Sequence, residues 1–147
     1  MTKLAANISM MFTEVDFLDR FEVAAKAGFK GVEYLFPCDY PAEQIKEKLD
    51  QNALTQVLFD FPAGDWDAGE RGIGALPDRV GEFQDGVGTA VEYARVLECE
   101  RLTVLAGKAN SNKTDVAMQQ TLIDNLKFAS NAVIDTNTTI LREAINT

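Results

Sequence analysis

The sequence contains no histidine, and this absence excludes several kinds of active site from these residues. A Ser-His-Asp or Cys-His nucleophilic apparatus and any histidine-ligated metal need at least one imidazole. Cysteine is nearly absent as well, since Cys38 and Cys99 are the only two and form no CxxC pair. Neither a structural zinc site nor a disulfide framework is therefore predicted.

Positive charge is also scarce, with 14 Lys and Arg against 23 Asp and Glu and a net charge of −9. Because sequence-independent nucleic-acid binding and docking on anionic lipid both depend on cationic side chains, we expect neither partner. Long apolar runs are missing too: the N-terminal stretch "MTKLAANISMMFTEVD" is interrupted by Asn7 and Ser9. The sequence predicts no signal peptide and no spanning helix, and the cytoplasm is the expected compartment.

What the chain does contain is a regular alternation of short apolar segments and amphipathic ones. Its 147 residues are enough for one domain, 1–147, with a hydrophobic core. The pattern predicts strands over 4–9, 31–36, 54–61, 101–107 and 138–145, the last one entering a core. It predicts helices over 13–28, with Thr13 as N-cap, and over 41–52, 80–99 and 114–135.

This βαβαβαβαβ order indicates an α/β protein with parallel strands joined by right-handed crossovers. Two architectures remain open at this point: an open doubly wound sheet, or the first part of a (β/α)₈ barrel. Length alone favours the open sheet, because a complete barrel needs roughly 200 residues or more.

Polar residues interrupt the predicted strands near their carboxyl ends, which is where ligands bind in both architectures. Those residues are Asn7, Ser9, Glu33, Asp60, Glu143 and Asn146. Each one taken alone also fits a solvated strand end or a helix cap. Their convergence on one edge favours a binding site.

The segment 62–79, "PAGDWDAGERGIGALPDR", is too long and too rich in glycine for a plain connection. It lacks the strand-to-helix context of a phosphate-binding loop, and the chain has no GxGxxG or GxxxxGK[ST] motif for nucleotides. A flexible solvated loop is one interpretation. We favour an ordered lid with Trp66 mostly buried, because an exposed Trp on a mobile loop is costly.

Four stretches, "AANISMMF", "GFKGVEYLFPCDYP", "FPAGDWDAGERGIGALPDR" and "ILREAIN", resemble the hydroxypyruvate isomerase family in order and spacing. That family belongs to the xylose-isomerase-like (β/α)₈ barrels, close to the bacterial 2-oxo-tetronate isomerases. The resemblance implies a TIM-barrel-type fold of which this chain covers about the first four βα units plus the fifth strand.

The resemblance also implies a reaction: the interconversion of hydroxypyruvate and tartronate semialdehyde through a metal-stabilised enediol, within carbohydrate and glyoxylate metabolism. Glu143 matches a catalytic glutamate that is also a ligand of a divalent metal, Mg²⁺ or Mn²⁺. The second carboxylate and the other ligands would lie in the family's second half. Asp60 stands where the family usually has Asn, and Ala144 where it often has Pro.

We expect the substrate, a small hydroxy-oxo acid or sugar, to contact several further side chains. These candidates are Asn7, Glu33, Asp60, Asp65, Trp66, Arg71 and Lys108. Arg71 and Lys108 are the cations available for the substrate carboxylate, and Trp66 would help to exclude water. The alternative for Arg71 is a structural ion pair within the loop.

Other functions remain open in the sequence. One is a related sugar or 2-oxo-tetronate isomerase or a 3-epimerase of the same barrel group. Another is a nuclease of the endonuclease-IV type, which the acidic charge and the lack of histidine disfavour. A third is a catalytically inactive truncated half barrel, whose unpaired sheet edges two copies would cover in a homodimer.

Overall fold

The computed structural model describes residues 3–36, 39–108 and 115–143, and its centre is one parallel sheet. The strands are β1 (Ala5–Asn7), β2 (Gly31–Tyr34), β3 (Thr55–Asp60), β4 (Arg101–Val104) and β5 (Thr139–Arg142). They lie side by side in chain order, and every neighbouring pair is parallel. A doubly wound sheet would insert the first strand between later ones, so this order confirms the barrel-type prediction.

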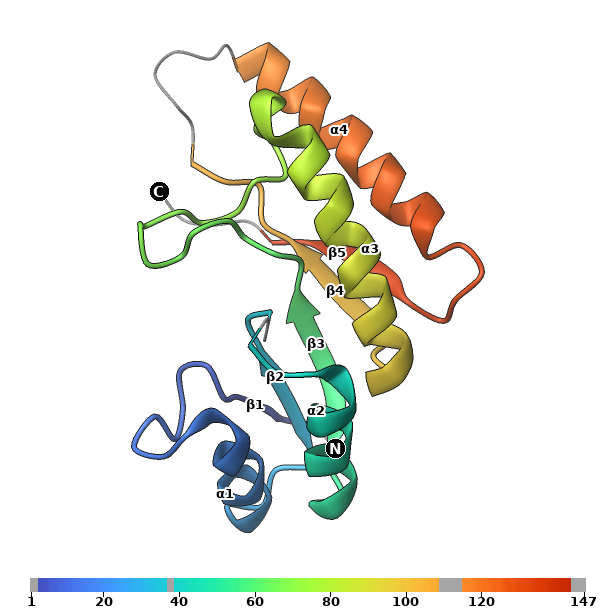
Figure 1. The fold of residues 1–147 in the computed structure, drawn as a ribbon. Coiled ribbons are helices and arrows are strands. Elements are labelled where there is room, and N and C mark those ends of the chain that lie inside the picture. Colours follow the sequence, from blue (N-terminus) through green and yellow to red (C-terminus); the bar gives the residue numbers. More distant parts are fainter. Residues whose placement is uncertain (1–2, 37–38, 109–114, 144–147) are drawn as a thin grey trace.

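The helices lie along the outer side of the curved sheet (Figure 1). They are α1 (Arg20–Lys26), α2 (Ala42–Gln51), α3 (Val80–Leu97) and α4 (Asp115–Ala132), with 3₁₀ turns η1 (Phe17–Asp19) and η2 (Pro77–Arg79) before α1 and α3. In α2, Ile45 and Leu49 are spaced by one helical turn and both are buried. Helix α3 ends where Glu98 adopts a left-handed conformation with φ of 55°.

The first helix is shorter than the sequence predicts, and Thr13 is not its N-cap. Residues 13 and 14 lie in a turn, and the 3₁₀ turn η1 begins only after Asp16. The guanidinium of Arg20 explains the difference, because it donates hydrogen bonds to the carbonyls of Val15 and Ile8 at 3.1 and 2.9 Å. These bonds hold the preceding segment as an ordered loop beneath the end of β1.

The fifth strand does not enter a core as predicted. Thr139, Leu141 and Arg142 are exposed, and only Ile140 packs against the hydrophobic core. Within the described residues β5 pairs with β4 alone, so one of its edges and much of its inner face meet solvent. The predicted strand end at 144–145, together with Ala144 and Asn146, lies outside the described residues.

A β-bulge between β2 and β3 decides which side chains face the inside of the curved sheet. Val32 pairs with Gln56, but the next residue, Glu33, pairs with Leu58, so β3 carries one extra residue. The side-chain amide of Gln56 donates to the Leu58 carbonyl at 2.7 Å across this bulge. Because side chains alternate along a strand, the extra residue turns Asp60 to the same face as Glu33.

No helix among the described residues is long and apolar enough to cross a membrane.

Candidate active site

A cavity of about 510 Å³ opens at the carboxyl ends of the strands, on the inner side of the sheet. Strand ends, the loop after β1 and the segment 62–79 all contribute to it. Its lining residues are Asn7, Met10, Glu33, Tyr34, Leu35, Leu58, Asp60, Trp66, Arg71, Thr103, Leu105, Leu141, Arg142 and Glu143. This edge of a parallel sheet is where ligands bind in barrel and open-sheet proteins alike.

Six of the eight predicted site residues line this cavity: Asn7, Glu33, Asp60, Trp66, Arg71 and Glu143. The other two do not. Asp65 is exposed on the segment 62–79, where its carboxylate accepts a hydrogen bond from the Ala68 amide at 2.9 Å. Lys108 is exposed and donates to the carbonyl of Gly69 at 2.7 Å. In the structure both side chains stabilise the shape of the loop.

The cavity floor near β1 and β2 is organised by Asn7. Its side-chain amide donates to the Glu33 carboxylate at 3.2 Å, and its carbonyl accepts from the Ser9 amide at 3.1 Å. Ser9 in turn accepts from the Leu35 amide through its hydroxyl at 2.9 Å. These bonds fix the orientation of Glu33 before any ligand is present.

Asp60 is the most deeply placed acid of the cavity, with only 8% of its surface exposed. Burial raises the pKa of its carboxyl group to about 7, and the nearby charges of Glu143 and Glu33 add to that effect. The carboxyl groups of Glu33, Asp60 and Glu143 therefore all line the same cavity. Such a group of like charges disfavours full ionisation, so Asp60 is partly protonated at neutral pH.

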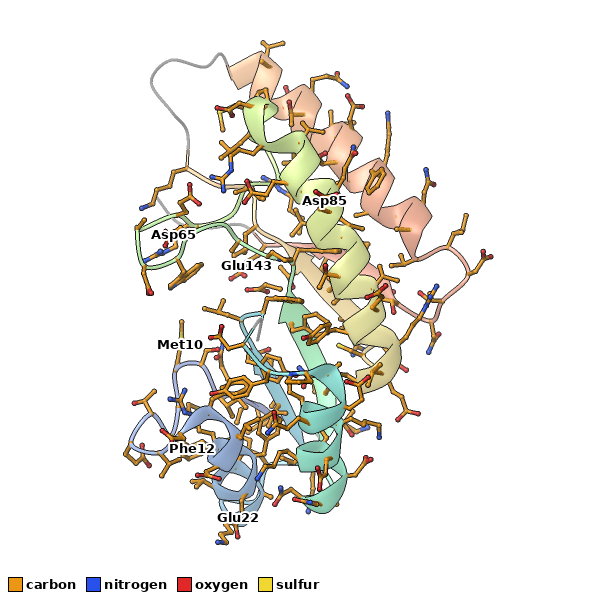
Figure 2. All side chains as sticks on the ribbon, in the orientation of Figure 1. Met10, Phe12, Glu22, Asp65, Asp85 and Glu143 are labelled. Atoms are coloured by element: carbon orange, nitrogen blue, oxygen red, sulfur yellow. The ribbon has the colours of Figure 1, made fainter. Side chains whose placement is uncertain are left out.

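Glu143 follows the last residue of β5 and is exposed at the cavity. Figure 2 shows it at the strand-end side of the sheet, beside the loop that carries Asp65. Met10 points toward that loop from the segment after β1 (Figure 2). An exposed carboxylate in this place can reach a ligand directly and take up or release a proton.

The segment 62–79, called the lid below, lies at the strand ends, where Trp66 and Arg71 line the cavity. The guanidinium of Arg71 lies 4.0 Å from the centre of the Trp66 ring, a cation–π contact. It also donates to the carbonyls of Trp66 and Glu70, at 3.0 and 2.6 Å. The loop ion pair considered for Arg71 is formed instead by Arg79 with Glu70.

Two features fasten the lid to the rest of the fold. Gly72 forms an antiparallel bridge with Ala106, and the amides of Gly74 and Ala75 donate to the carbonyls of Leu105 and Ala106, at 3.1 and 2.8 Å. At its other end Arg79 also pairs with Glu82 at the start of α3. Trp66 is partly buried at the cavity, and the order of the lid stays a prediction.

Sequence reasoning missed eight cavity residues: Met10, Tyr34, Leu35, Leu58, Thr103, Leu105, Leu141 and Arg142. Thr103 and Leu141 belong to strand patterns that look like ordinary core. A signal did exist for Arg142, because it interrupts an apolar strand directly before Glu143. Met10 is 74% exposed on a loop and carries no sequence signal that separates it from Met11.

Comparisons with known proteins agree with this geometry. The family model described as "Xylose isomerase-like TIM barrel" matches residues 21–147. The chain belongs to this family. It is 45% identical over 146 residues to hydroxypyruvate isomerase of Escherichia coli (strain K12), covering 99% of this chain and 57% of that protein. It is 46% identical over 147 residues to 2-oxo-tetronate isomerase of Cupriavidus necator, covering 100% and 56% respectively.

Among solved structures, the chain resembles one described as "AP endonuclease, family 2" from Brucella melitensis. The TM-score is 0.95 at 45% identity, over 99% of this chain and 56% of that one. This chain thus spans a little over half the length of the relatives it matches. The strand order of the described residues is that of a partial xylose isomerase-like barrel.

The donor set for a metal is incomplete within the described residues. No group of three Asp, Glu, His or Cys side chains there is placed to hold a metal ion. Glu33, Asp60 and Glu143 face one cavity with hard oxygen atoms of the kind that Mg²⁺ and Mn²⁺ prefer, but they do not form a ligand shell. A xylose isomerase-like barrel that binds such a metal needs donors beyond those described.

Proposed function

We propose that the protein carrying this chain is an isomerase of small hydroxy-oxo acids that interconverts hydroxypyruvate and tartronate semialdehyde. The observation that supports this most is the convergence of Glu143, Asp60 and Arg71 on one strand-end cavity. The names of the Escherichia coli and Cupriavidus necator relatives support the same class of reaction. We propose the cytoplasm as its compartment.

The chemistry moves one proton between neighbouring carbons. A base removes a proton from C3 of hydroxypyruvate and the C2 carbonyl oxygen gains one, which gives the enediol; a proton then adds at C2 while the C3 hydroxyl loses its proton and becomes the aldehyde carbonyl. We assign the proton transfer at one face of the enediol to the Glu143 carboxylate. A second acid or base must serve the other face, and the described residues do not assign one.

The remaining cavity groups would bind and orient the substrate. Arg71 is positioned to hold the substrate carboxylate with its free N–H donors, while Trp66 covers the site and excludes water. Asn7 and Glu33 form a preset pair of hydrogen-bonding groups on the floor. Asp65 and Lys108 are assigned the support of the lid rather than substrate contact.

We further propose a divalent metal, Mg²⁺ or Mn²⁺, for which Glu143 would be one ligand. When bound, such a cation would polarise the substrate carbonyl. Because the described residues offer no complete donor set, we route no step of the reaction through it.

A substrate panel tests this function on the longest protein that contains this chain. Hydroxypyruvate, 2-oxo-tetronate and a ketohexose are assayed with added Mg²⁺ or Mn²⁺, and an abasic-site DNA duplex serves as the nuclease probe. We expect turnover of the short oxo acids. Turnover of the ketohexose alone would support the 3-epimerase alternative, and cleavage of the duplex would support the nuclease. A protein inactive on all of them would match the inactive half barrel.

A further inference from the structure

We propose that Asp60 is a specificity-determining residue that favours a four-carbon 2-oxo acid over hydroxypyruvate. Its carboxyl group would accept a hydrogen bond from the hydroxyl group that the longer acid carries and the three-carbon acid lacks. This inference rests on the proposed isomerase function and names the substrate class of the same cavity.

The fold aims Asp60 at the cavity through the β-bulge in β3. If β3 kept all its residues but alternated strictly from Gln56 onward, without the bulge, Asp60 would face the outer, helix-covered side of the sheet. The side chain of Gln56, itself 3% exposed, donates to the Leu58 carbonyl and stabilises that bulge. Bulges of this kind re-aim single side chains next to active sites.

The Asp60 side chain lines the cavity and has no hydrogen bond to another described side chain or backbone group. Only 8% of the surface of the whole residue is exposed, so the carboxyl group reaches solvent through the cavity alone. Arg71, the lid cation that lines the same cavity, contacts the Trp66 ring and donates to two backbone carbonyls. Its carboxylate oxygens are not among the fully buried side-chain atoms that lack a partner, so the oxygens of Asp60 face the cavity and can accept a hydrogen bond from a ligand donor.

The negative charges near Asp60 determine which ligand group can donate a hydrogen bond to its carboxylate. Glu33 and Glu143 also bear on Asp60, so an anionic ligand group is repelled there and a neutral hydroxyl group is accepted. Strand β4 lies between β3 and β5, which separates the strand carrying Asp60 from the strand leading to Glu143 by about 10 Å. Asp60 therefore meets a part of the ligand distinct from the reacting carbon near Glu143.

The test compares two substrates in the longest protein that contains this chain. Steady-state kinetics with 2-oxo-tetronate and with hydroxypyruvate are measured for the unmodified protein, Asp60→Asn and Asp60→Ser. The control is Asp85→Asn, which makes the same chemical change on the exposed face of α3 (Figure 2). Far-UV circular dichroism checks that each variant is folded, and either folded Asp60 variant suffices.

We expect the ratio of kcat/KM for 2-oxo-tetronate over hydroxypyruvate to fall about tenfold in Asp60→Asn, mainly through KM for the longer acid. Asp60→Ser should shift the ratio in the same direction, and Asp85→Asn should leave it unchanged. An unchanged ratio in a folded Asp60 variant would overturn the role of Asp60 while the isomerase function stands. Turnover of neither substrate by the unmodified protein would overturn both claims.

Discussion

Asp60 illustrates how much of a single residue's position in this site can be predicted from the sequence. Its place at the end of a strand follows from the sequence, because a polar residue terminates an apolar run. The face of the sheet on which Asp60 lies depends on the bulge in β3, and no turn residue in the sequence predicts that bulge. The chain thereby buries an acid beside Glu33 and Glu143, and that arrangement has a measurable cost.

That cost predicts a pH-dependent stability. The folded chain raises the pKa of Asp60 from 3.8 to about 7, so the folded state binds more protons than the unfolded state between about pH 4 and pH 7. Stability should therefore fall as pH rises through that window, by an amount on the order of a few kcal/mol. Asp60→Asn should remove the fall, whereas Asp85→Asn should not. Urea unfolding at pH 4.5 and pH 8 measures this, and parallel pH profiles for all three proteins would contradict it.

Arg71 is the second residue whose role is tested singly. Its planar guanidinium stacks on the Trp66 ring while one nitrogen, Nη1, donates to the carbonyls of Trp66 and Glu70, and an ammonium group lacks the flat face for that stack. If the proposed function holds, Arg71→Lys in the longest protein that contains this chain should raise KM for hydroxypyruvate about tenfold with a smaller change in kcat. The matched control is Arg101→Lys, at the start of β4, where the side chain is exposed. Equal KM values in both variants would exclude Arg71 from substrate binding.

At the scale of elements, the lid depends on the close approach of its backbone to the segment after β4. Gly72 has a φ of 107°, and a Cβ added there would lie 2.3 Å from the Leu105 carbonyl oxygen. Only glycine fits this crossing, so the lid and the end of β4 are built as one unit.

Gly72→Ala should therefore displace the lid and destabilise the chain by about 1–3 kcal/mol. Trp66 is the only tryptophan, so its emission should shift to the red and become easier to quench. Gly81→Ala is the control, because an added Cβ in the first turn of α3 meets nothing within 4 Å. That variant should be neutral or slightly more stable. Identical Trp66 emission in the two variants would refute the attachment.

Elements and their order were predictable because hydrophobic spacing determines them. The periodic stripes of α2 and α3 appear where expected, and the parallel order confirms the barrel-type resemblance. The start of α1 was predicted wrongly because Arg20 binds the preceding loop through tertiary hydrogen bonds, which local capping rules do not contain. The sequence likewise did not show that Asp65 and Lys108 lie outside the cavity lining, because their loop contacts depend on how the lid folds back.

The whole molecule presents unpaired surfaces in the part of the chain that the structure describes. β1 and β5 each pair with one neighbour, and the apolar side chains of Val116, Phe128 and Ile134 on and after α4 are exposed. Open strand edges beside apolar surface favour association. This pattern fits a partial barrel that spans little more than half of its relatives' length.

We therefore predict that the 147-residue chain by itself associates into dimers or larger species at micromolar concentration. Light scattering after size exclusion measures the mass against the 16.2 kDa of one chain. Phe128→Ser should weaken the association by removing exposed apolar surface from α4. A stable 16.2 kDa monomer at all concentrations would contradict the prediction.

The central claim is that Glu143 transfers the proton in this cavity, and one measurement addresses it directly. Hydroxypyruvate in D₂O is followed by ¹H NMR with the longest protein that contains this chain and added Mg²⁺ or Mn²⁺. Both isomerisation and solvent exchange at C3 erase the methylene signal, so its decay reports removal of that proton. Glu143→Gln keeps the size of the side chain but cannot accept the proton, and we predict decay about 10²–10⁴ times slower than with the unmodified protein. Decay at the unmodified rate in a folded Glu143→Gln variant would contradict the account.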